Sequence, residues 1–297
     1  MPITRRKTLA LACAPWATLQ PIAARAQTPT SRIVASFSIL ADMAQELAPA
    51  GVQVTALVGP NADAHVYEPS PADGRRLAQA DLVVINGLGF EGWIERMIKV
   101  SGYRGRVAIA TQGIKPRQGG HHGTDPHAWQ DLAMARRYAV NISAAFAQRW
   151  PEQREAIAVR EADYIARIDR LDRQVREQLA AVPREKRRVI TSHDAFGYFG
   201  AAYGVDFMAP QGWATHSEPS AAAVARLIRQ IRNQGVRAVF IENISDPRLI
   251  ERLASEAGVR IGGTLYSDAL SAPDGPAGTY LRLIEHNARS IVTALQA

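Results

Sequence analysis

Cysteine, long apolar runs and an excess of one charge are all scarce in this sequence. The 297 residues include a single cysteine, which excludes a fold held together by disulfide bonds. Beyond the N-terminal segment, no apolar run approaches the roughly 20 residues that a membrane-spanning helix needs. With 47% hydrophobic and 21% charged residues, the composition excludes a disordered chain and is typical of a globular protein of about two domains.

The first 26 residues have the composition of a secretory leader. They contain no acidic residue, four basic residues, an Ala-rich apolar stretch and the small-residue end Ala24-Arg25-Ala26. We therefore predict export to the periplasm with cleavage after Ala26. The adjacent Arg5-Arg6 leaves both the general secretory route and the twin-arginine route open. Lipid anchoring at Cys13 is the alternative, but only a short apolar segment precedes that cysteine.

Loss of this leader changes the charge of the protein. Residues 1–26 hold four of the 35 basic residues and none of the 28 acidic ones, so the formal net charge falls from +7 to +3. A chain this close to neutral lacks the basic surface of a nucleic-acid-binding protein, and we predict no nucleic-acid partner. Cys13 is removed as well, and no Gly-x-Ser-x-Gly motif occurs, so no serine or cysteine nucleophile is indicated.

Short β-branched runs alternate with helical stretches in two separate blocks. Strands are predicted at Ile33–Phe37, Val52–Val58, Leu82–Asn86 and Val107–Thr111, and again at Val189–Ser192, Phe207–Ala209, Ala238–Glu242 and Arg260–Leu265. Such alternation is typical of parallel sheets covered by helices on both faces. We predict an α/β protein of two lobes, with an N-terminal lobe at 27–150 and a C-terminal lobe at 183–297.

One long helix is predicted between the two blocks, at 151–182. No glycine or proline follows Pro151 in this segment, and its apolar residues form one stripe at helical spacing: Ile157, Tyr164, Ile168, Leu171, Val175 and Leu179. A dimeric coiled coil would need a sustained heptad pattern, whereas a single stripe equally fits packing against the protein's own lobes. A stiff helix bridging the lobes is expected to limit hinge opening between them.

Four potential metal ligands fall near the ends of predicted strands or on a loop that can reach them. His65 follows the second strand, His193 follows the strand at 189–192, Asp268 follows the strand that ends at Leu265, and His127 lies on a loop. The carboxyl ends of parallel strands border the crevice where α/β proteins bind ligands. Taken singly, each histidine could be a solvated imidazole, and Asp268 could cap a helix. The neighbouring acids Asp63, Glu68, Asp125 and Asp194 could orient the imidazoles.

The sequence resembles the zinc- and manganese-binding solute-binding proteins of bacterial ABC importers, the cluster A-I family that includes the ZnuA and AztC types. The resemblance covers the chain from about Arg32 onward. It depends on the segments around His65, Asp125-Pro-His127-Ala-Trp129, His193-Asp-Ala-Phe-Gly-Tyr198 and Tyr266-Ser-Asp268. It implies two α/β lobes bridged by a long helix, with a metal held in the cleft between them by His65, His127, His193 and Asp268.

The resemblance also implies a function, a cargo and partners. Manganese members often have a carboxylate where this chain has His193. Three imidazoles and one carboxylate suit tetrahedral Zn²⁺, because Mn²⁺ prefers more oxygen ligands. We therefore predict a monomeric zinc receptor that delivers Zn²⁺ to the membrane subunits of an ABC permease, with a periplasmic metallochaperone as a further possible partner. Mn²⁺ and Fe²⁺ are the alternative cargoes. The His-rich loop of zinc members is reduced here to Gly119–Gly123, which leaves the role of His121 and His122 open.

Three alternatives from other classes stay open. A metal-dependent hydrolase would use His65, His127 and His193 as its zinc ligands and leave a position for water, whereas four protein ligands predict no enzyme activity. A surface adhesin could be built on the same scaffold. Gly87-Leu-Gly-Phe-Glu-Gly92 has the glycine spacing of a dinucleotide site, but no acid ends the next strand, so a tight turn is the better interpretation.

Overall fold

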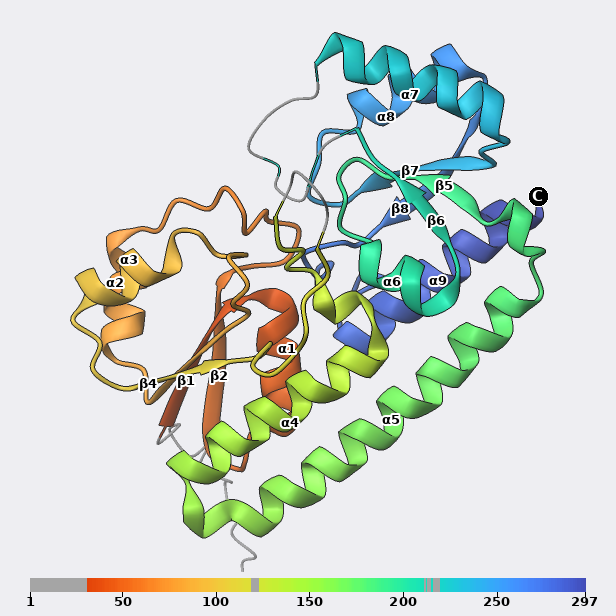
Figure 1. Ribbon diagram of the computed structural model, residues 1–297. Helices are drawn as coiled ribbons and strands as arrows, with labels where there is room; N and C mark the ends of the chain where they lie inside the picture. Colours follow the sequence, from red (N-terminus) through yellow and green to blue (C-terminus); the bar gives the residue numbers. More distant parts are fainter. Residues whose placement is uncertain (1–30, 119–122, 211, 213–214, 216–219) are drawn as a thin grey trace, which may run out of the picture.

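The computed structural model describes residues 31–118, 123–210, 212, 215 and 220–297. Within these ranges the chain forms two four-stranded parallel sheets, each flanked by helices (Figure 1). The predicted α/β class with two lobes is therefore confirmed. The predicted leader at 1–26, with Arg5-Arg6 and Cys13, lies outside the described residues, as do His121 and His122. Cleavage after Ala26 and the domain boundaries stay predictions.

The N-terminal lobe is built on the first sheet. Its strands are β1 (Ser31–Phe37), β2 (Val52–Val58), β3 (Leu82–Ile85) and β4 (Arg106–Ile109), in the spatial order β2-β1-β3-β4. Its helices are α1 (Ser38–Leu47), α2 (Pro71–Ala78), α3 (Ile94–Ser101) and α4 (Leu132–Arg149). All four predicted strands are confirmed: Val52–Val58 has the predicted ends, and the ends of the other three differ by at most two residues.

The C-terminal lobe repeats this topology. Its strands are β5 (Arg188–Ile190), β6 (Asp206–Met208), β7 (Ala238–Glu242) and β8 (Arg260–Leu265), in the equivalent order β6-β5-β7-β8. Its helices are α6 (Gly197–Tyr203), α7 (Ala221–Gln234), α8 (Arg248–Ala257) and α9 (Tyr280–Gln296). In each sheet the first strand of the lobe is an interior strand, with the second strand on one side of it and the third strand on the other. The strand order therefore reverses beside the first strand. A crevice at the carboxyl ends of the strands is expected at that point.

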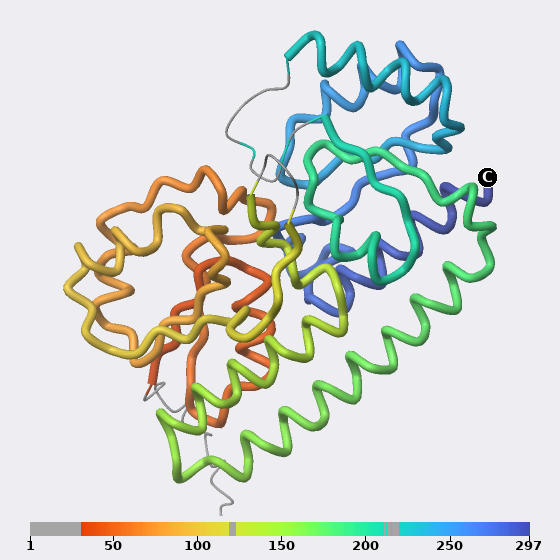
Figure 2. Tube along the Cα trace, viewed as in Figure 1, coloured from red at the N-terminus to blue at the C-terminus, as the bar shows by residue number. Residues whose placement is uncertain are grey.

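Helix α5 (Arg154–Ala180) runs along both lobes (Figure 2). The predicted helix at 151–182 is confirmed in position, but its first turn, Pro151–Gln153, is a 3₁₀ turn. Its 27 residues extend about 40 Å at 1.5 Å per residue. Its buried residues are the six of the predicted stripe, and the helix packs against α1, α4 and α9. The stripe is therefore covered within the chain itself, which disfavours the coiled-coil alternative.

Buried contacts join the two lobes where they meet. One hydrophobic core continues from the first sheet to α9 and includes Phe37, Trp129 and Tyr280. The indole Nε1 of Trp129 and the amide of Gln130 both donate to the carbonyl of Ser267, at 2.9 and 2.8 Å. Among the described helices, none has both the length and the apolar character required to cross a bilayer.

Candidate metal centre

His65, His127, His193 and Asp268 converge at the junction of the lobes. One potential ligand atom from each lies within 4.8 Å of all the others. The Nε2 atoms of His65 and His127 are 3.3 Å apart, and Asp268 Oδ2 lies 3.2 Å from His65 Nε2 and 3.1 Å from His193 Nε2. His65 is 6% exposed and the other three are fully buried. The structure therefore brings together all four candidates that the sequence indicated.

The spacing of these atoms is that of a metal coordination shell. Ligands 2.0–2.1 Å from a tetrahedral zinc ion lie about 3.3 Å from one another. The distances of 3.1–3.3 Å above, and 3.6 Å between His127 Nε2 and Asp268 Oδ1, bracket that value. Four donor atoms that are shielded from water and all lie within 4.8 Å of one another can close around one divalent cation through small side-chain adjustments.

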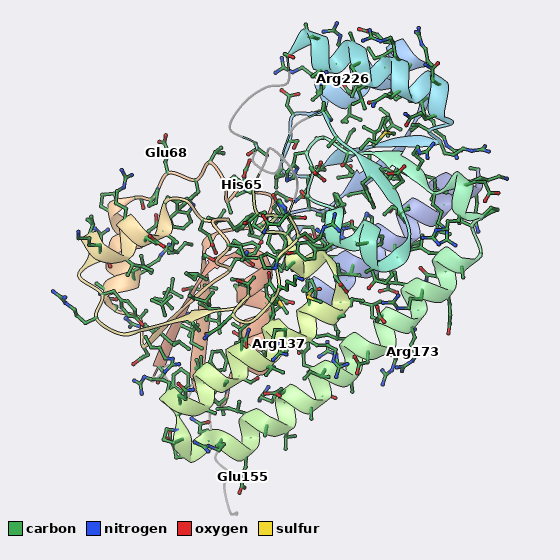
Figure 3. All side chains as sticks on the ribbon, viewed as in Figure 1. His65, Glu68, Arg137, Glu155, Arg173 and Arg226 are labelled. Atoms are coloured by element: carbon green, nitrogen blue, oxygen red, sulfur yellow. The ribbon has the colours of Figure 1, made fainter. Side chains whose placement is uncertain are left out.

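Strand ends and short loops deliver the four side chains. His65 lies on the loop between β2 and α2, and His193 lies three residues beyond β5. Asp268 lies three residues beyond β8, and His127 directly precedes a 3₁₀ turn at Ala128–Gln130. Two candidates thus come from each lobe. Figure 3 places His65 close to the junction of the lobes, whereas the nearby Glu68 extends from the outer surface.

Two buried carboxylates orient two of the imidazoles. Asp125 Oδ1 accepts from the backbone N–H of His127 at 3.0 Å and lies 2.9 Å from its Nδ1. Glu242 Oε1 accepts from the backbone N–H of His193 at 2.8 Å, while its Oε2 lies 2.7 Å from His193 Nδ1. In both histidines, Nδ1 therefore faces a carboxylate and Nε2 faces the cluster.

Aromatic rings enclose the cluster. Phe90 packs edge-on against His65, with ring centroids 4.6 Å apart, and Trp129 packs against His127 at 5.2 Å. Phe90 belongs to the glycine-rich segment 87–92, which forms the predicted tight turn. There the carboxylate of Glu91 accepts the backbone N–H groups of Asn86 and Gly87 at 2.6 and 3.2 Å. These N–H groups are thus engaged by a side chain of the turn itself, which disfavours the dinucleotide alternative.

Before a metal binds, the electrostatics of the cluster are governed by Asp268. Burial raises the pKa of Asp268, but His193 and His127 outweigh burial and hold it well below its usual value. Burial lowers the pKa of His127, yet Asp268 and Asp125 together raise it to about 9. For His65, burial prevails over Asp268 and its pKa is lowered. The carboxylate is therefore ionised at neutral pH, as a metal ligand must be.

Among the four acids expected beside the ligands, Asp125 has the predicted orienting role. Asp125 contacts the ring of His127, as described above. Asp63 accepts from the backbone N–H of His65 at 2.8 Å and from Thr215 at 2.5 Å, and so fixes the loop of His65. Glu68 is exposed, and the backbone of Asp194 donates to Gly212.

Glu242 is the residue that sequence reasoning missed. A signal was present, because an acid ends the otherwise apolar strand Ala238–Glu242 at the same edge of the sheet as His193 and Asp268.

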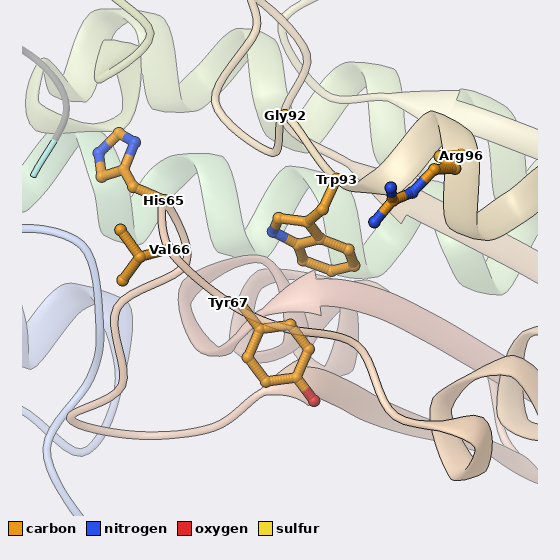
Figure 4. Close-up of a pocket in the computed structure, with 6 residues that line it drawn as sticks. All are labelled: His65, Val66, Tyr67, Gly92, Trp93 and Arg96. Atoms are coloured by element: carbon orange, nitrogen blue, oxygen red, sulfur yellow. The ribbon is translucent and has the colours of Figure 1, made fainter. Parts of the chain in front are cut away.

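A separate hollow lies on the outer side of the His65 loop. It has a volume of about 430 Å³ and is lined by His65, Val66, Tyr67, Gly92, Trp93 and Arg96. Figure 4 shows the imidazole of His65 turned away from Trp93 and Tyr67. This hollow is therefore not the space between the four candidate ligands.

Comparison with known proteins gives consistent matches along the chain. The family described as ZnuA, zinc-uptake complex component A, periplasmic, matches residues 33–294. The zinc-binding protein TroA of Treponema pallidum is 32% identical over 271 residues, which cover 89% of this chain and 88% of that protein. The manganese-binding lipoprotein MntA of Bacillus subtilis is 32% identical over 275 residues, covering 89% and 90%. The iron-binding protein YfeA of Yersinia pestis is 33% identical over 259 residues, covering 85% and 82%.

A solved structure agrees with these matches. The periplasmic zinc-binding protein TroA from Treponema pallidum superposes with a TM-score of 0.86 at 30% sequence identity. The superposition covers 89% of this chain and 99% of that one.

Proposed function

Because this chain belongs to the ZnuA family of metal-binding substrate-binding proteins of ABC transporters, we propose that it captures Zn²⁺ in the periplasm and delivers it to an ABC-type import permease. His65, His127, His193 and Asp268 are the proposed ligands. The observation that supports this proposal is the burial of three imidazole nitrogens and one carboxylate oxygen within 4.8 Å of one another, with three of the pairs 3.1–3.3 Å apart, near the spacing of a tetrahedral shell.

The donor set favours zinc over manganese. Three nitrogen donors and one carboxylate match the preference of Zn²⁺, whereas Mn²⁺ prefers more oxygen ligands and a higher coordination number. The names of the relatives include manganese- and iron-binding proteins, so Mn²⁺ and Fe²⁺ are the competing cargoes. Competition between these ions for one site will decide among them.

Capture and delivery, with no chemical step, are consistent with the site. A hydrolytic zinc needs an open position for water, and four protein ligands would fill a tetrahedral shell. Release would then require that one ligand leaves the ion. Asp268 and His127 lie on loops, so movement of one of these loops is the proposed release step. The membrane subunits of the permease are the proposed recipients.

The decisive experiment is a competition titration with a chromogenic chelator. We expect the wild-type protein to bind one Zn²⁺ tightly and to prefer it over Mn²⁺ and Fe²⁺. His193→Ala removes one ligand and is expected to weaken zinc binding by more than about 100-fold, beyond the roughly 10–100-fold effect of changing a residue behind a ligand. His286→Ala is the matched control, because His286 lies on α9 and donates toward the Thr264 carbonyl, outside the cluster.

Two results would contradict the proposal. One is a loss below about tenfold in His193→Ala, with both variants folded as judged by circular dichroism. The other is metal-dependent turnover of ester or amide substrates by the wild-type protein, which would favour the hydrolase alternative. An adhesin would instead bind its partner after all four proposed ligands are changed.

A further inference from the structure

Glu242 is a fully buried acid whose two oxygens both face the same histidine. It ends β7 and is 0% exposed. Its Oε1 accepts from the backbone N–H of His193 at 2.8 Å, and its Oε2 lies 2.7 Å from His193 Nδ1. Among the described residues, neither His193 Nδ1 nor Glu242 Oε2 has another polar partner. The backbone N–H and Nδ1 of His193 therefore both depend on the side chain of Glu242.

We propose that Glu242 is a positioning residue that fixes the tautomer of His193, an inference that rests on the proposed metal function. A carboxylate beside Nδ1 keeps the proton on that nitrogen and leaves the lone pair on Nε2, the atom 3.1 Å from Asp268 Oδ2. The contact with the backbone N–H of His193 fixes the carboxylate in turn, so the ring cannot rotate without losing its Nδ1 contact with Glu242 Oε2. His193 then meets the metal in the one protonation form that can bind through Nε2.

A glutamine at this position cannot replace the acid, because it offers one acceptor to two donors. If the amide oxygen faces the backbone N–H of His193, the amide NH₂ faces Nδ1. The ring then accepts at Nδ1 and carries its proton on Nε2, where the metal should bind. If the amide is flipped, its NH₂ meets the backbone N–H, and two donors face each other in a buried site. Either orientation impairs His193 as a ligand.

Asp125 provides a natural contrast in the same cluster. Its single Oδ1 lies 3.0 Å from the backbone nitrogen of His127 and 2.9 Å from its Nδ1. An asparagine can keep both contacts with its one carbonyl oxygen. Its NH₂ would replace Oδ2, which lies 3.5 Å from Nε of Arg117, a side chain that is 42% exposed and can turn toward solvent. Glu242→Gln and Asp125→Asn thus each remove one negative charge behind a candidate ligand, but the former alone forces a change of tautomer.

The test measures zinc affinity and the state of the histidine rings in Glu242→Gln and Asp125→Asn. We expect Glu242→Gln to weaken zinc binding by about 10–100-fold, and Asp125→Asn by several-fold less. Long-range ¹H–¹⁵N spectra of zinc-loaded wild type should show His193 protonated at Nδ1 and bound through Nε2. In Glu242→Gln this pattern should be lost for His193 and kept for His127. Equal losses in the two variants, or an unchanged His193 pattern, would overturn the proposal.

Making Glu242→Gln in the His193→Ala variant separates positioning of His193 from a general effect of Glu242 on folding. With His193→Ala in place, a glutamine at 242 can give its oxygen to the backbone N–H and its NH₂ to the space left by the ring. Glu242→Gln should then cause no further loss of zinc affinity beyond about twofold. A full additional loss would show that Glu242 acts independently of His193 and would overturn the inference. Failure of the wild-type protein to bind metal would instead contradict the proposed function itself.

Discussion

At the scale of single residues, His127 must lose a proton before it can act as the proposed zinc ligand. Burial lowers the pKa of His127, but Asp268 and Asp125 raise it to about 9, so this imidazole is charged at pH 7 until a metal displaces its proton. We expect zinc binding at pH 7 to release at least one proton per ion, and the affinity to fall about tenfold per released proton for each unit of pH below 7. Titration calorimetry in two buffers of different ionisation enthalpy measures this number. A binding enthalpy independent of the buffer would contradict it.

The candidate ligands could be predicted from the sequence, whereas the role of Glu242 could not, and the difference has a physical reason. His65, His193 and Asp268 could be proposed from the sequence because each follows a predicted parallel strand, and strand ends meet at one edge of a sheet. Glu242 also ends a strand, but its role depends on a 2.7 Å contact with His193, 49 residues away in the chain. Pairing at that range is set by the order of the strands and the packing between them, which a single sequence does not encode as a local pattern.

At the scale of elements, an acid on α1 supports the start of α9. Asp42 accepts from the backbone N–H of Tyr280 at 2.8 Å. Burial raises the pKa of Asp42 to about 6 against the opposing effect of this hydrogen bond, with Glu46 raising the pKa further and Arg167 lowering it. The native protein therefore keeps this proton up to about pH 6, whereas the unfolded chain loses it near 3.8. As the pH rises from about 4 to about 6, the contribution of Asp42 to stability declines.

Replacement of Asp42 by asparagine should remove the loss of stability that ionisation of the buried carboxyl group causes. Asp42→Asn keeps an acceptor for Tyr280, and we expect it to raise the free energy of unfolding at pH 7 by about 1–2 kcal/mol, a value reduced for the partial exposure of the site. Below pH 4 the gain should vanish. Urea unfolding of the metal-free protein at several pH values tests this, with Asp163→Asn on the exposed side of α5 as control. A variant less stable than wild type at pH 7 would refute the expectation.

The predictions of helices and strands were confirmed where the spacing of apolar residues along the sequence determines which residues are buried. The six apolar residues of α5 at helical spacing are the residues that it buries. Its start differed, because Pro151 opens a 3₁₀ turn that follows the end of α4 at Arg149. Five of the eight predicted strands differed at an end by one or two residues, since pairing with neighbouring strands decides where a ladder stops. The alternation of elements therefore predicted the α/β class, whereas exact ends depend on tertiary contacts.

At the scale of the whole molecule, the junction between the lobes is held by contacts close to the candidate metal centre. Trp129 and Gln130 donate to the Ser267 carbonyl, and Leu270 N–H donates to Ser38 at 3.0 Å. Helix α5 packs against α1 and α9 and so bridges both lobes along its length. A large rotation of the lobes would break these buried bonds and distort the shared core. Metal release should therefore involve local movement of the loops that carry His127 or Asp268.

Spin labels can test this directly, because the chain from residue 27 onward contains no cysteine. Val100→Cys on α3, where the native side chain is 76% exposed, and Arg226→Cys on α7 place one label on each lobe. We expect the distance between the labels to change by less than about 3 Å when a chelator removes the metal, since rotation is opposed by α5 and by the bonds to Ser267. The pair Val100→Cys and Val159→Cys, with its second label near the N-terminal end of α5, provides the reference. A shift well above that limit in the first pair but not in the reference would show hinge opening and would contradict release by loop movement alone.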